Sequence, residues 1–421
     1  MNSLRNSHVF PEKGSSEQKI KSEMDAARQK DIDWFSLKNL TASYYGGEDV
    51  ARIAMEAFVQ HIGDNVVHQN GLHPSVALYE REVLEMTLNL FSAPVDAAGT
   101  VTTGGSESIA LALKAARDRA RALKGITKPQ IVIPKTAYAV FNKLCHLMNI
   151  EVVQIDRERN FAADPAAMAE AVTGNTIMLV GSAPPFPHAN VDPIREIAEI
   201  AAARDIWMHV DACIGGFVLP FARMLGEDVP DFDFSVPRVT SISSDYHKYG
   251  YAYRGCSALL LRDKSLLEWQ TFSTDAWPAG HYASRNMAGS RNSGPVASAW
   301  AVMKYLGLEG YKERVAGIIA GRRAFRERLE PLDGVQILGT PQGPHFSFTV
   351  GDADVLAVAD GLMAKGWGIN IETKPPAILL MLSAHHIASA EPFAADLAEV
   401  MEAVRGRGQS AAGDTVAYGI Y

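Results

Sequence analysis

The sequence predicts an α/β protein in which a large domain, built on a mostly parallel sheet, is followed by a smaller α+β domain. Three observations carry this prediction. Strands and helices alternate through the middle of the chain, the strands are continuously apolar, and the pattern changes near residue 308. Continuous apolar strands are typical of parallel sheets that helices cover on both faces. Right-handed crossovers then bring the loops after the strands to one edge of the sheet, where ligands bind.

The alternating part of the chain contains short apolar runs and longer segments with apolar residues at helical spacing. The expected strands are residues 99–103, 130–134, 151–155, 176–182 and 206–212. The expected helices between them are residues 109–124, 140–148, 165–172 and 194–204. Three helices precede this part, at residues 17–30, 48–63 and 76–91.

The pattern differs in the second half of the chain. Residues 241–261 read as a short strand, a tight polar turn and a second strand of small and apolar residues. Helices are expected at residues 298–308 and 310–330, followed by a βαβ-like unit and a closing helix at 393–405. The predicted division is an N-terminal segment at 1–64, a large domain at 65–308 and a small C-terminal domain at 309–421.

The composition indicates a protein with a large buried core. Hydrophobic residues make up 47% of the 421 residues and charged residues 21%, and the formal net charge is −8. The negative charge argues against nucleic acid as a partner, so an anionic ligand needs local cations or helix N-termini. Because no run of about 18 apolar residues occurs, we expect no membrane span. The N-terminus lacks the apolar segment of a signal peptide.

Three cysteines, Cys145, Cys213 and Cys256, lie far apart in apolar segments. Their spacing matches no metal site. Buried reduced thiols are typical of a reducing compartment, so we expect a cytoplasmic protein.

The turn within residues 241–261 contains Lys248. His247 precedes it and Tyr249 follows it, so rings flank the amine between two buried strands. Desolvation lowers the pKa of a lysine and makes its amine a nucleophile toward an aldehyde. These residues favour a Schiff-base lysine that holds pyridoxal 5'-phosphate (PLP). The alternative is a structural lysine, and the decision between the two depends on the other motifs.

Two further motifs fit this hypothesis. Gly105 and Ser106 stand where a strand runs into a helix, and glycine lets the backbone approach an anion at the positive end of that helix. Asp211 ends an apolar strand, where a carboxylate needs a cationic partner such as the protonated ring nitrogen of PLP. The alternatives are an ordinary strand–helix turn and a core or capping aspartate.

Other residues are candidates for the same pocket. His209 points to the same side of its strand as Asp211, so it would stack near the cofactor, orient Asp211 or serve as a core histidine. Tyr138 follows the end of a strand and would stack on the cofactor face or pack in the core. Gly289 and Ser290 begin a GSRNSG segment that suggests a second phosphate contact or a plain turn.

Together these motifs resemble those of one family. Sphingosine-1-phosphate lyases, of the PLP-dependent group II decarboxylase superfamily, carry similar segments in the same order: GGSES, PKTAYAVFNK, GSAPPFPHANVDPI, HVDACIGGFVLPF, SISSDYHKYGYAYRG and MAGSRNSG. The resemblance extends from about residue 9 to the end of the chain. It implies fold type I with a seven-stranded sheet, and a homodimer whose active sites are shared between subunits.

The resemblance also implies roles for single residues. Lys248 would be the Schiff-base lysine and Asp211 the partner of the pyridine nitrogen. Gly105 and Ser106 would bind the cofactor phosphate, and His209 would lie in the cofactor pocket.

Further implied roles concern the neighbouring subunit and the substrate. Gly289 and Ser290 would reach the cofactor phosphate of the neighbouring subunit. The base that takes up the substrate proton stays undetermined among His247, Tyr138 and the substrate phosphate. The substrate phosphate would meet Tyr45, Asn70, His73 and Arg254.

The implied reaction is cleavage of the C2–C3 bond of a phosphorylated long-chain amino alcohol, which yields a long-chain aldehyde and phosphoethanolamine. The chain departs from the family where Tyr138 replaces a ring-stacking histidine and Arg254 replaces a lysine. These departures leave room for an L-amino-acid decarboxylase, or for an aldolase acting on another β-hydroxy amino compound. A binding or scaffold protein that has lost catalysis is the third alternative, and the presence of Lys248 and Asp211 argues against it.

Overall fold

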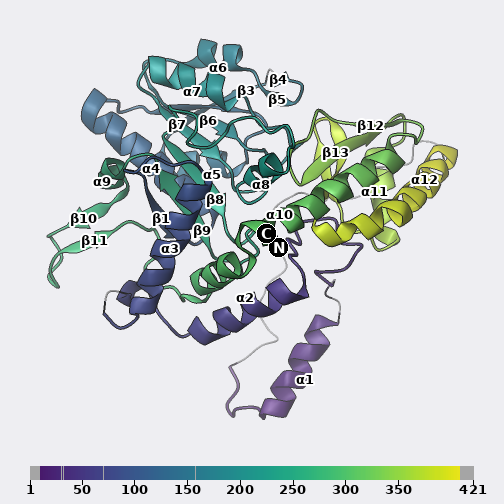
Figure 1. The fold of residues 1–421 in the computed structure, drawn as a ribbon, viewed down its shortest axis with the longest axis horizontal. Coiled ribbons are helices and arrows are strands. Elements are labelled where there is room, and N and C mark those ends of the chain that lie inside the picture. Colours follow the sequence, from purple (N-terminus) through teal and green to yellow (C-terminus); the bar gives the residue numbers. More distant parts are fainter. Residues whose placement is uncertain (1–9, 30, 32, 70, 157, 408–421) are drawn as a thin grey trace. The chain divides into compact units, whose positions relative to one another are not determined.

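The computed structural model describes residues 10–407 apart from residues 30, 32, 70 and 157. The chain divides into two units, Met1–Ser36 and Leu37–Tyr421. The first unit contains α1 (Glu17–Arg28), and the hydroxyl of Ser16 caps its start. The other described helices and strands belong to the second unit (Figure 1). The division expected at residues 64 and 308 stays a prediction.

A seven-stranded sheet forms the centre of the second unit (Figure 1). Its strand order is β1-β9-β8-β7-β6-β2-β3. Neighbouring strands from β8 to β3 are parallel, whereas β9 is antiparallel to both β1 and β8. The strands are β1 (Ala98–Thr102), β2 (Gln130–Pro134), β3 (Glu151–Ile155), β6 (Thr176–Ser182), β7 (Trp207–Asp211), β8 (Ser241–Asp245) and β9 (Ser257–Leu261). The predicted α/β class with a mostly parallel seven-stranded sheet is confirmed.

Helices cover both faces of this sheet because alternate strand residues point to opposite sides. Leu259 and Leu261 of β9 belong to a buried cluster with residues of α4 and α5. Leu260, between them, belongs to the cluster on the other face with residues of α7 and α8. The covering helices are α3 (Pro74–Leu90), α4 (Gly105–Lys124), α5 (Val140–Met148), α6 (Pro165–Ala171), α7 (Ile194–Ala203) and α8 (Leu219–Met224).

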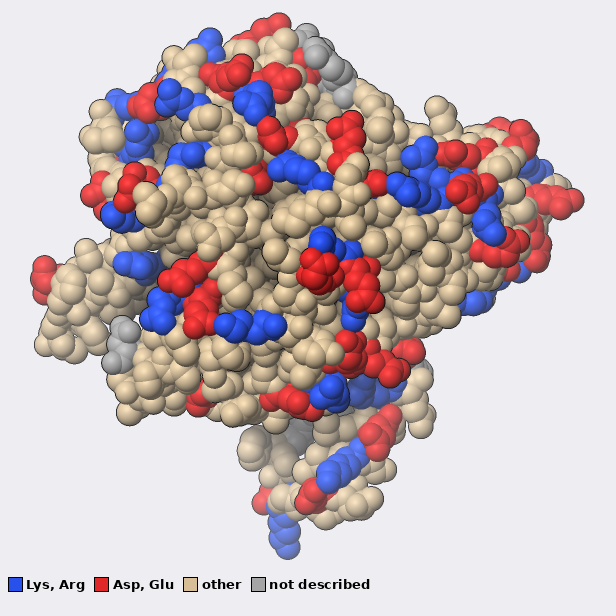
Figure 2. Space-filling model, in the orientation of Figure 1, with Lys and Arg blue, Asp and Glu red and all other residues tan. Residues whose placement is uncertain are grey.

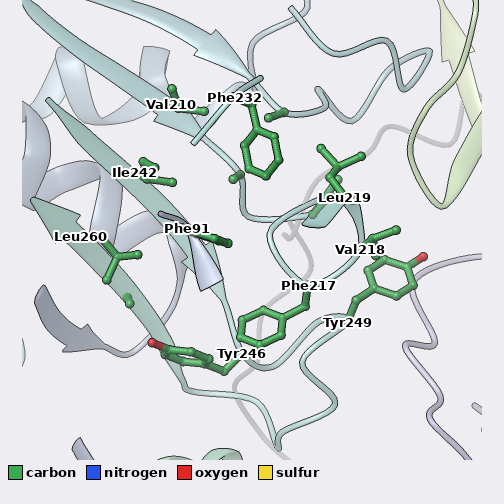
Figure 3. Close-up of a cluster of buried hydrophobic side chains, with 14 of the residues drawn as sticks. Phe91, Val210, Phe217, Val218, Leu219, Phe232, Ile242, Tyr246, Tyr249 and Leu260 are labelled. Atoms are coloured by element: carbon green, nitrogen blue, oxygen red, sulfur yellow. The ribbon is translucent and has the colours of Figure 1, made fainter. Parts of the chain in front are cut away.

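Large aromatic side chains fill the second of these faces. Figure 3 shows Val210, Ile242 and Leu260, from three adjacent strands, near the rings of Phe91, Phe217 and Phe232. Tyr246 and Tyr249 belong to the same cluster and flank the turn that contains Lys248. The turn is therefore anchored by buried rings on both sides of the lysine.

The C-terminal part has its own antiparallel sheet, in the order β12-β13-β15-β14. Its strands are β12 (Val335–Ile337), β13 (His345–Val350), β14 (Asn370–Thr373) and β15 (Pro376–Met381), and its helices are α11 (Val355–Ala364) and α12 (Ala390–Arg407). The βαβ-like expectation is wrong because β13 and β15, on either side of α11, pair antiparallel. The unexpected strand β14 follows α11 and reverses the chain once more before β15.

The two helices expected at residues 298–308 and 310–330 fall within α10 (Gly294–Leu329), in which two helices meet at a kink. Gly307 interrupts it with a non-helical backbone at φ 55° and ψ −170°. A positive φ is accessible to glycine without strain, so the interruption falls where the sequence indicated a boundary.

Smaller elements complete the second unit. These are α2 (Glu48–His61), η1 (Val66–His68), β4 (Glu158–Arg159), β5 (Ala162–Ala163), η2 (Lys264–Leu266), α9 (Leu267–Gln270), β10 (Phe272–Thr274), β11 (Tyr282–Ser284) and η3 (Ala384–Ser389). The antiparallel pair β10–β11 was not anticipated from the sequence. Among the helices of the described residues, none is long and apolar enough to cross a bilayer. Figure 2 shows acidic and basic side chains interspersed over the visible face.

Candidate active site

Lys248 follows the end of β8 and pairs with a carboxylate that the sequence analysis did not single out. Its Nζ lies 2.9 Å from Oδ2 of Asp245, the last residue of β8. Asp245 is 3% exposed and also accepts a hydrogen bond from the hydroxyl of Ser257 on the neighbouring strand β9. His247 adds a ring nitrogen, Nε2, at 3.7 Å from the same carboxylate oxygen.

This pairing overturns the expected direction of the lysine pKa. Desolvation alone would lower the pKa of Lys248, as expected from the sequence. The charge and hydrogen bond of Asp245, together with Tyr44 and Cys213, outweigh it, and the pKa is raised well above its ordinary value. The pKa of Asp245 is in turn lowered, because Lys248 and His247 outweigh the effect of burial. Lys248 is thus held as an ammonium beside the ionised carboxylate of Asp245.

The start of α4 faces the same space. The first N–H groups of a helix have no acceptor within the helix. Gly104, the residue before α4, provides no side-chain cap for them. A Cβ at Gly105 would lie 2.7 Å from Sγ of Cys213 and 3.0 Å from Oδ1 of Asp245. A side chain at Gly105 would therefore collide with the site, and its absence leaves the helix start, with its positive end, open to an anion.

Asp211 ends β7 close to these residues. It is 7% exposed, and its Oδ1 accepts hydrogen bonds from the Cys213 N–H at 3.1 Å and from the Ser243 hydroxyl at 3.2 Å. These donors stabilise a buried carboxylate and orient it.

His209 is buried on β7 and does not line the cavity. Its ring is fully buried, with Nδ1 2.8 Å from the Ser241 hydroxyl and Nε2 3.3 Å from the Ser243 hydroxyl. Burial lowers the pKa of His209 to about 3, so the ring is neutral. Ser243 bonds both His209 and Asp211, and the role of His209 stays a prediction.

A cavity of about 370 Å³ connects these groups. Its lining includes seven of the residues named from the sequence: Gly105, Ser106, Tyr138, Asp211, His247, Lys248 and Arg254. It also includes residues that the sequence analysis missed: Tyr44, Pro184, Phe186, Cys213 and Asp245. Asp245 has a local signal, since it ends a strand three residues before Lys248, whereas Tyr44 and Phe186 carry none.

Tyr44, rather than the expected Tyr45, lines this cavity. The guanidinium of Arg254 lies 5.4 Å from the Tyr44 ring centre, and its Nη2 donates to the carbonyl of Ala42 at 3.3 Å. The N–H of Tyr45 donates to the Ser383 hydroxyl at 3.0 Å, and its ring packs edge-on against His385.

Three of the remaining predicted residues, His73, Gly289 and Ser290, do not line the cavity. His73 is beside Asp64, with Nδ1 3.4 Å from Oδ1. Gly289 and Ser290 are exposed in the loop before α10. Asn70 lies outside the described residues. The roles assigned to these four residues stay predictions.

Sequence comparison decides the family. The conserved domain of pyridoxal-dependent decarboxylases matches residues 2–350. The chain belongs to this family.

Its relatives within the family include sphingosine-1-phosphate lyases. That of Oryza sativa subsp. japonica is 37% identical over 403 residues, which cover 94% of this chain and 74% of the relative. That of Dictyostelium discoideum is 36% identical over 405 residues, which cover 96% of this chain and 76% of the relative. The solved structure of the Burkholderia pseudomallei sphingosine-1-phosphate lyase is 33% identical, with a TM-score of 0.89 over 96% of this chain and 94% of that one.

The cofactor is PLP, and the residues of the cavity fit it. The amine of Lys248 matches the aldehyde of PLP, and the buried carboxylate of Asp211 matches its protonated ring nitrogen. The open start of α4 matches its phosphate. Gly105, where a Cβ would collide with the site, gives the phosphate room to reach the backbone. The chain is a PLP-dependent lyase.

Proposed function

We propose that this enzyme cleaves the C2–C3 bond of a phosphorylated sphingoid base, releasing a long-chain aldehyde and phosphoethanolamine. The observation that carries the proposal is the single cavity that joins Lys248, Asp211 and the start of α4 in a chain 33–37% identical to sphingosine-1-phosphate lyases. The proposed substrate, a phosphorylated sphingoid base, follows from the name of those relatives.

Four groups of this chain would hold the cofactor. Lys248 would bind its aldehyde carbon, and the carboxylate of Asp211 would accept a hydrogen bond from the ring N–H. Gly105 and Ser106, at the start of α4, would hold the phosphate. PLP supplies the electron sink for the pair of electrons left when the C–C bond breaks.

Proton transfer falls to groups around Lys248. Lys248 must release its ammonium proton before its amine reacts, and Asp245 Oδ2, 2.9 Å from Nζ, opposes this release. His247 and Tyr138 both line the cavity, so both stay candidates for the base that takes the C3 hydroxyl proton, beside the substrate phosphate. Tyr138, which lines the cavity and is 37% exposed, would also cover the cofactor face.

The phosphate of the substrate would be bound by Arg254, the cation at the edge of the cavity. Arg254 also borders a second cavity of about 130 Å³, together with Arg291 and Glu80. Tyr45, Asn70 and His73 are proposed to assist it.

We propose a homodimer with shared active sites. Support comes from Gly289 and Ser290, which are exposed and do not line their own cavity, as residues that serve a neighbouring subunit would be. We also propose a cytoplasmic location, since Cys145, Cys213 and Cys256 are buried free thiols.

Aldehyde release from a phosphorylated sphingoid base, measured with the PLP-loaded enzyme, tests this function. The expected result is stoichiometric aldehyde and phosphoethanolamine, lost in Lys248→Arg. Carbon dioxide from an L-amino acid without aldehyde would instead establish the decarboxylase alternative. Turnover of a smaller β-hydroxy amino compound alone would establish the aldolase alternative, and no turnover of any of these with PLP bound would favour a binding protein.

A further inference from the structure

One wall of the active-site cavity comes from the loop after β6. Pro184 and Phe186 of this loop line the cavity that contains Lys248. Neither residue belongs to a helix or strand, so their positions depend on contacts with other parts of the chain. The contacts behind Phe186 lead to the C-terminal sheet.

His345 on β13 makes the first of these contacts. Its ring is fully buried and stacks on Phe186, with ring centres 6.3 Å apart and planes 26° apart. Its Nε2 lies 3.0 Å from the carbonyl oxygen of Pro185. Burial lowers the pKa of His345 to about 4, so the ring is neutral and Nε2–H donates to this carbonyl.

Glu372 on β14 makes the second contact. Its Oε1 accepts a hydrogen bond from the Ser347 hydroxyl at 2.7 Å, and its Oε2 lies 3.1 Å from Nδ1 of His188, in the same loop as Phe186. The side chains of His188 and Glu372 are 3% and 9% exposed. The backbone of His188 has φ 66°, an unfavourable conformation for this residue that the surroundings must maintain.

Further hydrogen bonds tie the loop to the segment before β13. Gln342 accepts from the Val191 N–H at 2.9 Å, and its own N–H donates to the Ala189 carbonyl at 3.1 Å. Asn190 accepts from the Thr340 N–H at 3.0 Å. The loop is thus held by the C-terminal sheet on both sides of His188, and Phe186 has a defined position.

Stability does not account for the polar cluster of His188, His345, Ser347 and Glu372. Nδ1 of His345 is buried without a hydrogen bond within the described structure, and the 3.1 Å contact between Nδ1 of His188 and Oε2 of Glu372 is not a well-aligned hydrogen bond. Buried polar atoms of this kind cost free energy, and apolar residues of similar size would pack the same space without that cost. Such a departure from good packing next to a reaction site favours a functional role.

We propose that the polar cluster is a positioning device, which sets Phe186 against the cofactor and substrate for reaction at Lys248. The cluster joins the C-terminal sheet to the loop after β6, so the C-terminal part determines the shape of a cavity that contains Lys248 and Asp211. Its four members touch no reacting atom and act through Phe186. The inference concerns the geometry of the PLP site and does not depend on which substrate is cleaved.

The test compares PLP-loaded variants by visible circular dichroism of the bound cofactor, kcat and KM. His345→Leu removes the donor to Pro185, and Glu372→Gln removes the charge while keeping an acceptor for Ser347. Both are expected to change the cofactor signal and to lower kcat about tenfold or more, with a smaller change in KM. His345→Gln, which restores an N–H, is expected to recover part of the loss.

Phe348→Leu is the matched control, because Phe348 is on β13 but packs in the C-terminal core against Phe346 and Phe393. It should lower the unfolding temperature while leaving the cofactor signal and kcat unchanged. In a Phe186→Leu background, His345→Leu should have no further effect on either readout.

The proposal is wrong if His345→Leu and Glu372→Gln behave like Phe348→Leu, or if the effects of Phe186→Leu and His345→Leu are additive. A wild-type enzyme without aldehyde release would refute the proposed function alone, since circular dichroism still decides the positioning role.

Discussion

Asp245→Asn tests the pairing on which the chemistry of Lys248 depends. Two unit charges 2.9 Å apart attract by about 6 kcal/mol at an effective dielectric constant of about 20. Breaking a buried pair costs about 3–5 kcal/mol in practice. Because 21% of the Lys248 side chain is exposed and an unpaired lysine can release its proton, we expect a loss of about 3 kcal/mol in the free energy of unfolding.

The dependence of this loss on pH follows from the two pKa shifts. The raised pKa of Lys248 contributes stability that is fully present below the unfolded pKa, about 10.4, and is lost as the pH rises through the folded pKa. The lowered pKa of Asp245 contributes stability present above about 3.9 and lost as the pH falls through the folded pKa. The difference between wild type and variant is therefore largest between about pH 5 and 10.

Two measurements check this prediction on the protein before PLP is added. Urea unfolding gives the loss of stability, and the absorption change on adding PLP, followed against pH, reports when the Lys248 amine reacts. Without the carboxylate, burial dominates and the pKa of Lys248 falls, so the variant should react at lower pH than the wild type.

Asp233→Asn is the control, since Asp233 is buried and lies 3.6 Å from Arg223 but does not line the cavity. It should lose stability without changing the pH dependence of the PLP reaction. If Asp245→Asn reacts with PLP at the same pH as the wild type, Asp245 does not control the protonation of Lys248.

Three further predictions concern the cofactor site. Lys248→Ala should abolish the visible absorption of bound PLP while circular dichroism in the far ultraviolet stays unchanged; retained absorption would assign the covalent link to another lysine. The Cβ of Gly105→Ala would lie 2.7 Å from Sγ of Cys213. This variant should lose about 1–3 kcal/mol in the free energy of unfolding and bind PLP more weakly. Gly174→Ala, whose Cβ would have no atom within 4 Å, is the control and should change neither stability nor PLP binding. The pKa of His209 is about 3 in the folded protein and about 6.5 in the unfolded chain. The wild type should therefore lose about 4 kcal/mol in the free energy of unfolding as the pH falls from about 6.5 to about 3. His209→Gln should lack this loss, and equal acid sensitivity of the two proteins would contradict the prediction.

Much of the fold was predictable because it depends on short-range patterns. The strands β2, β3 and β6 begin and end at the residues that their apolar runs indicated, and α5 does likewise. The antiparallel C-terminal sheet was not predictable in the same way, since β14 is short and only half-buried. Without that strand, β13, α11 and β15 read as a parallel crossover.

The amino-acid sequence by itself determined the chemistry of this protein: a lysine between two buried strands, a carboxylate ending a third strand and a glycine at a helix start. Only the tertiary structure decided the protonation of that lysine, because Asp245 counteracts the desolvation that the sequence argument considered alone. Likewise only the fold decided that Tyr44 faces the cavity, and that His345 and Glu372 lie behind Phe186. Hydrophobic periodicity is a local property of the chain, whereas contacts between residues more than a hundred positions apart depend on how the sheets and helices pack.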